Sequence, residues 1–278
     1  MGDCIYCNKP AGMFKNKHQE CVNKHNQGLN DILTDFEDSL ETESPMTDLI
    51  SHAKEIAENC YIDKETLSKT LRRGWRLAID KAFDDGILTE QEEERMKEMA
   101  VALGYTQEKL NKDKGFIQLV QGSILRDIMN GNIPSKFEIS GDLPFNFKKD
   151  EKLVWIFSDV EYSEMKTIKQ FVGGSQGISV RIAKGIYYKT STFKGQQVES
   201  NAIMPVDSGI AAITDKNIYF TGAIKSFRTP YNKIMTIMPY DDGVGFQKDT
   251  QTAKPQIFKV GNGWFIYNLI RNLMELSK

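Results

Sequence analysis

The sequence predicts an α+β multidomain protein that combines a small zinc-binding module, an all-α helical bundle and a seven-stranded β-barrel with a C-terminal helix. Three observations predict this architecture. Cysteines gather near the N-terminus, apolar residues recur every three or four positions in the middle, and apolar and polar residues alternate in the last part. We expect domains at residues 1–28, 29–133 and 150–278, with a linker at 134–149.

Length and charge support several modules in one chain. The 278 residues are 40% hydrophobic, which is enough for more than one core. The formal net charge of −2 combines +2 in residues 1–28, −10 in 29–147 and +6 in 148–278. These opposite signs suggest modules that dock on each other or on different partners, while ordinary solvated surfaces are the plain alternative.

The expected location is the cytoplasm, with peripheral attachment to the inner membrane as an option. No run approaches the roughly 18 apolar residues that a membrane-spanning helix needs. The opening MGDCIYCNKP also lacks the apolar core of a secretory signal.

The first predicted site is a metal centre made by Cys4, Cys7, His18 and Cys21. Their spacing, C-x2-C-x10-H-x2-C, places two pairs of ligands within reach of one ion. Four protein ligands leave no open position, so we expect structural zinc (Zn²⁺) and no metal catalysis. His25 is an alternative to His18 as the fourth ligand, and Cys60 is expected to be a small buried residue.

The layout of residues 1–24 resembles zinc-knuckle and treble-clef modules. Such modules bind nucleic acid, bind protein or only cap a fold. Nucleic-acid binding would draw on the basic and aromatic residues of this segment, namely Lys9, Lys15, Lys17, Lys24, Tyr6 and Phe14.

Apolar stripes with helical spacing predict five helices through the middle of the chain, which begin near Asn16, Pro45, Asp63, Glu90 and Thr106. Thr89 and Glu92 have the spacing of a capping box, and Gly104 is expected to end the helix that follows. The last helix is predicted to run without interruption from Thr106 to Asn130.

The string DDGILTEQEEERMKEMAVALG, within residues 45–131, resembles a TerB-like (tellurite-resistance-type) helical domain. The resemblance implies that acidic residues can form a metal-binding cluster. Asp80, Asp84 and Glu93 are the candidates for a second metal here. Favourable interaction of acidic side chains with helix N-termini explains the same residues without a metal.

From residue 153 onward the pattern predicts strands. The segments LVWIFSDV and YSEMKTIK are expected to be separate, with a hairpin at SDVEYSEM, and the FVGGSQG glycines are expected to form a hairpin turn. Further strands are expected at 177–190, 202–206, 210–214, 218–222, 226–230, 234–239, 243–248 and 256–260. The closing segment GWFIYNLIRNLMELS has the apolar face of an amphipathic helix.

The string ITDKNIYFTG…FRTPYNKIMTI resembles the bacterial PH-like and GRAM-like family. The residues that carry the resemblance are Thr214, Ile218, Tyr219, Phe220, Pro230, Tyr231, Lys233 and Ile234. The resemblance covers residues 150–278 and implies a bent seven-stranded barrel with the helix at one end. It also implies binding of membrane lipids or proteins. The acidic SDVEYSEM segment favours a protein partner over an anionic lipid.

The expected function is that of a non-enzymatic adaptor that binds a protein partner through the PH-like and helical domains. Histidines occur only at 18, 25 and 52, and no cysteine follows Cys60, so no nucleophile–base pair is indicated. The resemblances imply a bacterial or phage setting, in stress response or phage–host conflict. One alternative is a peripheral membrane sensor that uses Lys148, Lys149 and Lys152. The other is a nucleic-acid-binding protein that uses the zinc module. The partner and the oligomeric state are not indicated.

Overall fold

The structure is a computed structural model. It describes residues 2–12, 14–134, 143–172, 180–183, 186–188, 196–250 and 254–277, and for the members of this set between 167 and 201 it describes the backbone. The chain divides into two compact units, Met1–Arg126 and Asp127–Lys278. Residues 135–142 of the expected linker and the glycines of the expected FVGGSQG turn lie outside the described residues.

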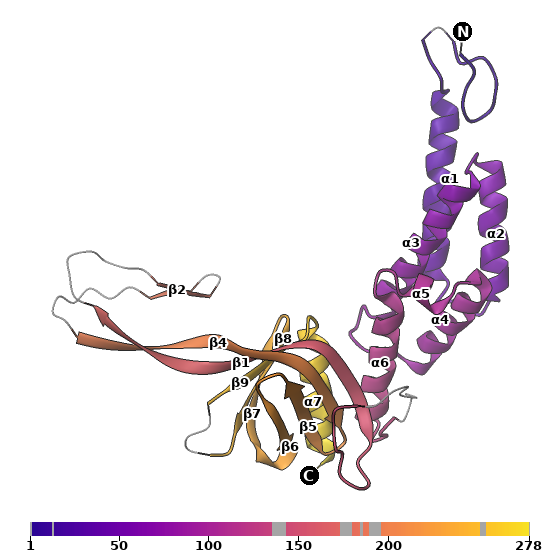
Figure 1. Ribbon diagram of the computed structural model, residues 1–278. Helices are drawn as coiled ribbons and strands as arrows, with labels where there is room; N and C mark the ends of the chain where they lie inside the picture. Colours follow the sequence, from indigo (N-terminus) through magenta and orange to yellow (C-terminus); the bar gives the residue numbers. More distant parts are fainter. Residues whose placement is uncertain are drawn as a thin grey trace. The chain divides into compact units, whose positions relative to one another are not determined.

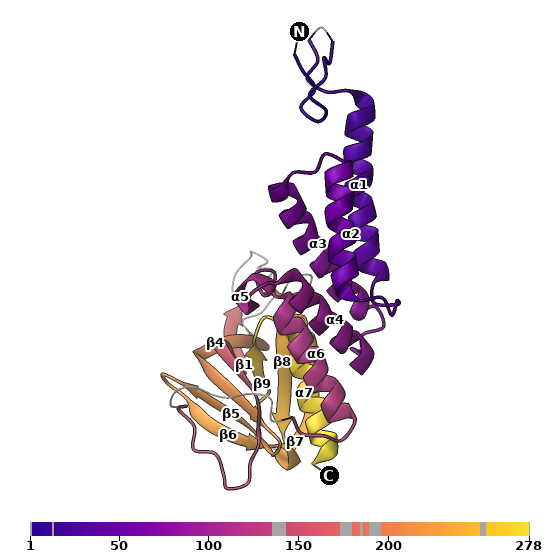
Figure 2. The same cartoon turned by 90° about the vertical axis from the view of Figure 1, so that its right-hand side faces the viewer.

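Helices build most of the first unit (Figures 1 and 2). They are α1 (Gln19–Asp38), α2 (Met46–Asn59), α3 (Lys64–Ala82), α4 (Glu90–Leu103), the short α5 (Gln107–Leu110) and α6 (Gly115–Met129), whose last residues extend past the division between the units. Helix α1 packs on both α2 and α3. The fully buried side chains at the centre are Ile32, Phe36, Trp75, Ile79, Leu88, Met96 and Met99.

Local side-chain contacts set the ends of these helices. The Asp63 carboxylate accepts the backbone N–H groups of Glu65 and Thr66 at the start of α3. Thr89 and Glu92 form the predicted capping box of α4, and Gly104 ends that helix with φ of 59°. The predicted capping box and the predicted helix end are confirmed. The sequence sufficed for both because caps depend on residues only two or three positions apart.

The prediction of one continuous helix from Thr106 to Asn130 is wrong, because a turn separates α5 from α6. Lys114 has φ of 64°, a left-handed conformation that a helix does not tolerate. A Cβ atom on Gly115 would lie 2.5 Å from Cδ1 of Ile79, so the backbone of α6 approaches α3 closely here. Close packing on α3 therefore changes the direction of the chain at Gly115, although the apolar pattern of the sequence continues through this point as if the helix were unbroken.

The second unit contains a seven-stranded antiparallel sheet in the order β6-β5-β4-β1-β9-β8-β7. Its strands are β1 (Leu153–Val172), β4 (Gln196–Thr214), β5 (Asn217–Gly222), β6 (Ser226–Pro230), β7 (Ile234–Tyr240), β8 (Gly243–Lys248) and β9 (Gln256–Lys259). The strands β2 (Val180–Ala183) and β3 (Ile186–Tyr188) form a separate two-stranded sheet.

The sheet curls and carries a helix on it. Strands β6 and β7 are the two edges of the sheet, yet only the 3₁₀ turn η1 (Tyr231–Lys233) joins them, so the sheet must bend to bring these ends together. Helix α7 (Gly263–Leu276) packs on β7 and β8. The rings of Phe265 and Trp155 lie 5.0 Å apart at the contact between helix and sheet. The predicted α+β fold class is confirmed.

Strand β1 is continuous where a hairpin was expected. Asp159 has φ of 57° and lies in a bulge between Phe157 and Val160, so the chain kinks without reversing. The segments predicted at 202–206 and 210–214 likewise belong to the one strand β4. The prediction of a hairpin at SDVEYSEM is therefore wrong. The polar residues of this segment suit a turn as well as a bulge, so the sequence alone did not distinguish the two.

Strands β1 and β4 continue well beyond the rest of the sheet as a two-stranded ribbon (Figure 1). Strand β9 pairs with β1 only at residues 161–164, and β5 pairs with β4 only at 209–213. Pairing between β1 and β4 continues from Lys166↔Ala202 to Val172↔Gln196. We call Lys166–Val172 and Gln196–Ala202 the arm.

Candidate metal centre

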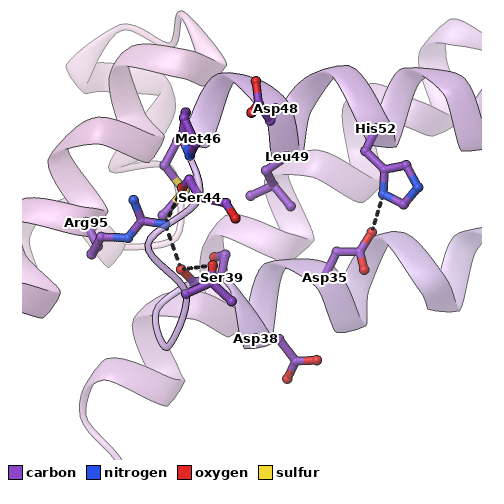
Figure 3. Close-up of a pocket in the computed structure, with 11 residues that line it drawn as sticks. Asp35, Asp38, Ser39, Ser44, Met46, Asp48, Leu49, His52 and Arg95 are labelled. Carbon is purple, nitrogen blue, oxygen red and sulfur yellow. Dashed lines mark hydrogen bonds and ion pairs between the residues drawn. The ribbon is translucent and has the colours of Figure 1, made fainter.

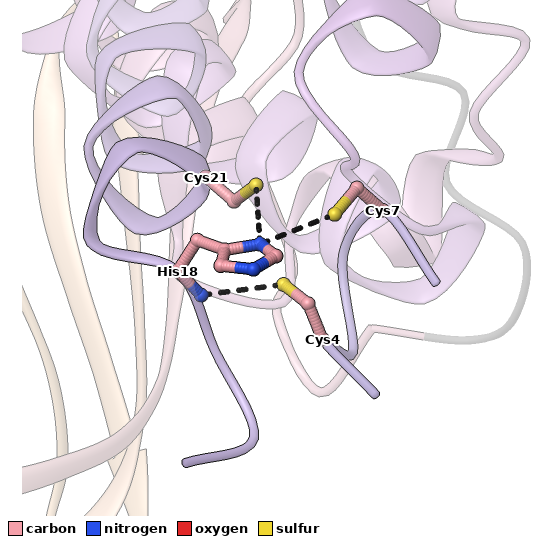
Figure 4. Close-up of side chains that lie close together, drawn as sticks. All are labelled: Cys4, Cys7, His18 and Cys21. Carbon is pink, nitrogen blue, oxygen red and sulfur yellow. Dashed lines mark hydrogen bonds between the residues drawn. The ribbon is translucent and has the colours of Figure 1, made fainter. Parts of the chain in front are cut away.

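Three thiols and one imidazole meet at the N-terminal end of α1 (Figure 4). The ligand atoms of Cys4, Cys7, His18 and Cys21 all lie within 4.8 Å of one another. Nδ1 of His18 lies 3.3 Å from Sγ of Cys7 and 3.8 Å from Sγ of Cys21. Zinc bonds of 2.0–2.3 Å in a tetrahedron separate neighbouring ligand atoms by about 3.3–3.8 Å. The two separations from His18 match this spacing, and the whole set is gathered closely enough for its four side chains to hold one zinc ion.

A knuckle-shaped turn presents the first two cysteines. The carbonyl of Cys4 accepts the N–H of Asn8 at 2.8 Å, and the N–H of Cys4 donates to the carbonyl of Lys9 at 2.8 Å. Asn8 takes φ of 55°, which an asparagine tolerates better than most residues. The turn brings both thiols to one side, because only two residues separate them.

The other two ligands come from the start of α1. His18 is the residue before the helix and Cys21 lies in its first turn, so a separation of three positions brings them close together. The backbone N–H of His18 donates to Sγ of Cys4 at 3.4 Å. This hydrogen bond ties the helix end to the knuckle and stabilises a thiolate at Cys4.

The imidazole of His18 is oriented by a backbone group. Its Nε2 lies 3.0 Å from the carbonyl oxygen of Pro10, which can only accept a hydrogen bond. Nε2 therefore carries the proton, and the lone pair on Nδ1 faces the thiols. A metal-bound histidine commonly has such a second partner, which sets its tautomer and orientation.

The pKa values of two of the thiols are shifted in opposite directions. Burial raises the pKa of the Cys4 thiol, but hydrogen bonds from the backbone of Cys7, His18 and Tyr6 outweigh burial and lower it to about 6. Burial and the neighbouring Cys7 and Cys4 raise the pKa of Cys21 to about 11. The Pro10 carbonyl and Cys7 raise the pKa of His18. A bound cation would relieve this crowding of negative charge.

The structure places His25, the alternative ligand, and corrects the expectation that Cys60 is buried. His25 lies outside the cluster, with Nδ1 3.2 Å from the carbonyl oxygen of Tyr61. Cys60 also lies elsewhere and is only partly buried, and its Cβ and Sγ pack against the backbone of Gly28 in α1. The residues that form the cluster are those of the predicted C-x2-C-x10-H-x2-C pattern.

An aromatic cluster that sequence reasoning missed joins the module to the bundle. The Tyr6 ring lies 4.8 Å from the His25 ring and 6.2 Å from the Tyr61 ring. Tyr61 belongs to the turn between α2 and α3 and has φ of 58°. Burial, followed by the charges of the three thiols, raises its pKa. No spacing rule links position 61 to position 6, so only the folded chain reveals the contact.

The acidic residues proposed for a second metal are engaged with basic side chains. Asp80 pairs with Arg76 one turn earlier in α3, and Asp84 pairs with Lys81. Glu93 pairs with Arg126 and Lys97. Within the described part of the chain, the Cys3His cluster is the group of three or more ligand residues that gathers around one point.

An open hollow of about 280 Å³ lies beside the connection from α1 to α2 (Figure 3). Its polar groups already contact one another. Nδ1 of His52 lies 3.1 Å from the Asp35 carboxylate, and Arg95 donates to the carbonyl oxygens of Ser39 and Ser44. We therefore interpret this hollow as the surface of a helix connection that these hydrogen bonds hold in place, and we assign it no ligand.

Among the described residues, no helix is both long enough and apolar enough to cross a membrane. Comparison with known protein families and with curated protein sequences finds no match for this chain. The assignment of a function therefore depends on the geometry of the chain itself.

Proposed function

We propose that this chain is a non-enzymatic interaction protein in which structural zinc holds the N-terminal module together. The observation that carries this proposal is the closed Cys3His set, in which four protein ligands surround one point. A catalytic zinc needs an open position for water or substrate, and this set offers none. Each histidine also has a partner already, with His25 on the Tyr61 carbonyl and His52 on Asp35.

We further infer that the helices are TerB-like and that the second unit is a PH-like or GRAM-like domain. The curled seven-stranded sheet with its C-terminal helix supports the second inference. Tyr231, within the resemblance motif, is buried and donates to the carbonyl of Thr214 at 2.7 Å. The motif thus has a role in the packing of the sheet, and bacterial stress response or phage–host conflict remains the setting that the resemblance implies.

A groove between α2 and α4 is the surface that best suits a protein partner. It has a volume of about 500 Å³, and its apolar lining includes Pro45, Met46, Val101 and Ala102. Val101 is 81% exposed although it is apolar. The same groove is also lined by charged residues, namely the largely exposed Glu94, Lys97 and Glu98, with Glu43 and the buried Arg95. A surface that combines exposed apolar residues with charged neighbours is typical of a protein–protein interface.

A site-specific cross-link tests the partner. A photoreactive residue replaces Val101 in one protein and Ile87, which is 46% exposed outside the groove, in a control. After irradiation in the native cell, we expect one partner to be captured at position 101 and not at 87. Val101→Asp in the otherwise native chain should abolish co-purification of that same partner. Equal recovery by Val101→Asp and wild type would overturn the groove as the interface.

Metal analysis tests the zinc separately. We expect one zinc per chain in freshly purified protein and in Cys60→Ser, and less than a tenth of that in Cys7→Ser. Protein that purifies without zinc, or Cys7→Ser that retains it, would refute the structural centre.

A further inference from the structure

The turn between α2 and α3 contains a tyrosine at a position that usually belongs to glycine. Cys60 ends α2, and the N–H of Ile62 donates to the carbonyl of Ala57 at 2.9 Å, which is the hydrogen bond of a Schellman motif. Tyr61 therefore occupies the left-handed position of this motif, with φ of 58°. Glycine adopts this conformation without strain, whereas a bulky residue does not. The strain indicates that the Tyr61 side chain has a role that glycine could not fill.

Tyr61 packs on the face of α1 that carries the metal-cluster residue Cys21. Residues three and four positions apart share a helix face, so Lys24 and His25 lie next to Cys21. Nζ of Lys24 lies 5.6 Å from the centre of the Tyr61 ring, and Nδ1 of His25 lies 3.2 Å from the Tyr61 carbonyl oxygen. Gly28, one turn further along α1, lets the α2–α3 turn approach closely, because a Cβ atom there would lie 2.6 Å from the nearest side-chain atom of that turn.

The side chain of Tyr61 also reaches the cluster itself. Its ring lies 6.2 Å from the ring of Tyr6, which stands between Cys4 and Cys7 in the knuckle. Burial, then the charges of the three thiols, and then a hydrogen bond to Cys21 raise the pKa of the Tyr61 hydroxyl. A tyrosine hydroxyl carries its proton at neutral pH, so it is the donor to a thiolate, which can only accept. Hydrogen bonds to an ionised acceptor are stronger than those between neutral groups.

We propose that Tyr61 is a positioning residue of the metal centre, which donates a hydrogen bond to the Cys21 thiolate and thereby links zinc retention to the α2–α3 turn of the bundle. This inference rests on the proposed function, because it requires zinc at the Cys3His set. Partners of this kind, outside the ligand set, typically change metal affinity by about 10–100-fold when they are removed. A tyrosine that only fills the turn has no such effect.

The test measures zinc affinity in the full chain by competition with a chromophoric zinc chelator. Tyr61→Phe keeps the ring and removes only the donor, so it should bind zinc about tenfold more weakly than the wild type. Tyr61→Gly should bind zinc at least as weakly, although glycine relieves the strain of the turn. The matched control is Lys114→Gly, which relieves a left-handed φ of 64° at an exposed position outside the module and should retain the wild-type affinity.

Cobalt (Co²⁺) in place of zinc gives a second measurement that a purely structural role would not change. A hydrogen bond lowers the energy of the thiolate lone pairs, so its loss in Tyr61→Phe should shift the thiolate-to-cobalt charge-transfer band to longer wavelength. Circular dichroism verifies that each variant folds. If Tyr61→Phe retains the wild-type zinc affinity or the wild-type cobalt band, this inference is overturned and the structural centre stands. A wild type that binds no zinc overturns both.

Discussion

The ring of His18 is held by Pro10, whose carbonyl oxygen lies 3.0 Å from Nε2. The contact directs Nδ1 toward the thiols of Cys7 and Cys21. A proline cannot donate a backbone hydrogen bond, but its carbonyl is free to accept one. The turn between the two halves of the ligand pattern thus also determines the tautomer of the fourth ligand.

We predict that His18 and His25 differ in their effect on zinc. His18→Ala removes a ligand and should reduce retained zinc to below a tenth of the wild-type content after dialysis against a weak chelator. His25→Ala removes a ring that contacts Tyr6, so zinc should remain stoichiometric. Elemental analysis of the two variants, side by side, makes the comparison. Loss of zinc from His25→Ala and not from His18→Ala would show that His25, and not His18, is the fourth ligand.

We predict that zinc affinity rises with pH. Cys21, with a pKa raised to about 11, is protonated in the metal-free module at neutral pH and must release its proton on binding zinc. Cys4, with a pKa lowered to about 6, is already ionised above that pH and becomes protonated below it. The His18 pKa is raised, so its ring also competes for protons as the pH falls.

The affinity should therefore decline steadily from pH 8 to pH 6 and more steeply below about 6. Competition with a chromophoric zinc chelator of known pH dependence measures it across this range. An affinity that stays constant between pH 8 and pH 5.5 would contradict the assigned ligands.

We predict that Arg95 stabilises the bundle by pinning the connection between α1 and α2. Its Nη2 donates to the carbonyl oxygens of Ser39 at 2.9 Å and Ser44 at 2.8 Å, and the side chain is largely buried. Arg95→Ala leaves both carbonyls without this donor and should lower the free energy of unfolding by about 2–4 kcal/mol. Urea denaturation measures the change. Arg73→Ala, at an exposed position of α3, is the control and should change it by less than about 0.5 kcal/mol.

We predict that Gly74 cannot be enlarged, although alanine is the better helix former. A Cβ atom at position 74 would lie 2.6 Å from the Phe36 ring, which is itself fully buried. Gly74→Ala should therefore destabilise the protein by about 1–3 kcal/mol. Ser68→Ala, at an exposed position of the same helix, should have little effect or stabilise slightly. A thermal melt in which Gly74→Ala is the more stable variant would show that the contact between α1 and α3 is looser than described.

Predictions that depend on nearby residues agree well with the structure. The capping box of Thr89 and Glu92, the end of α4 at Gly104, and the strands at 226–230 and 243–248 all appear as expected. The ligand spacing belongs to the same class, because a turn and the start of a helix suffice to gather the four side chains.

Predictions that depend on long-range packing were less successful. Close approach of Gly115 to Ile79 separates α5 from α6, and the bulge at Asp159 leaves β1 continuous. In both places the local pattern was compatible with two conformations, and contacts with another element selected between them.

The sequence by itself determined which four side chains gather as the candidate metal site, several helix caps and most of the short strands, since each depends on a turn, a helix start or a strand built from nearby residues. Only the tertiary structure decided that Tyr61 meets Tyr6 and that β1 and β4 extend as one arm. These features depend on pairing between residues far apart in the chain, and no local propensity records which distant partner a side chain or strand will find.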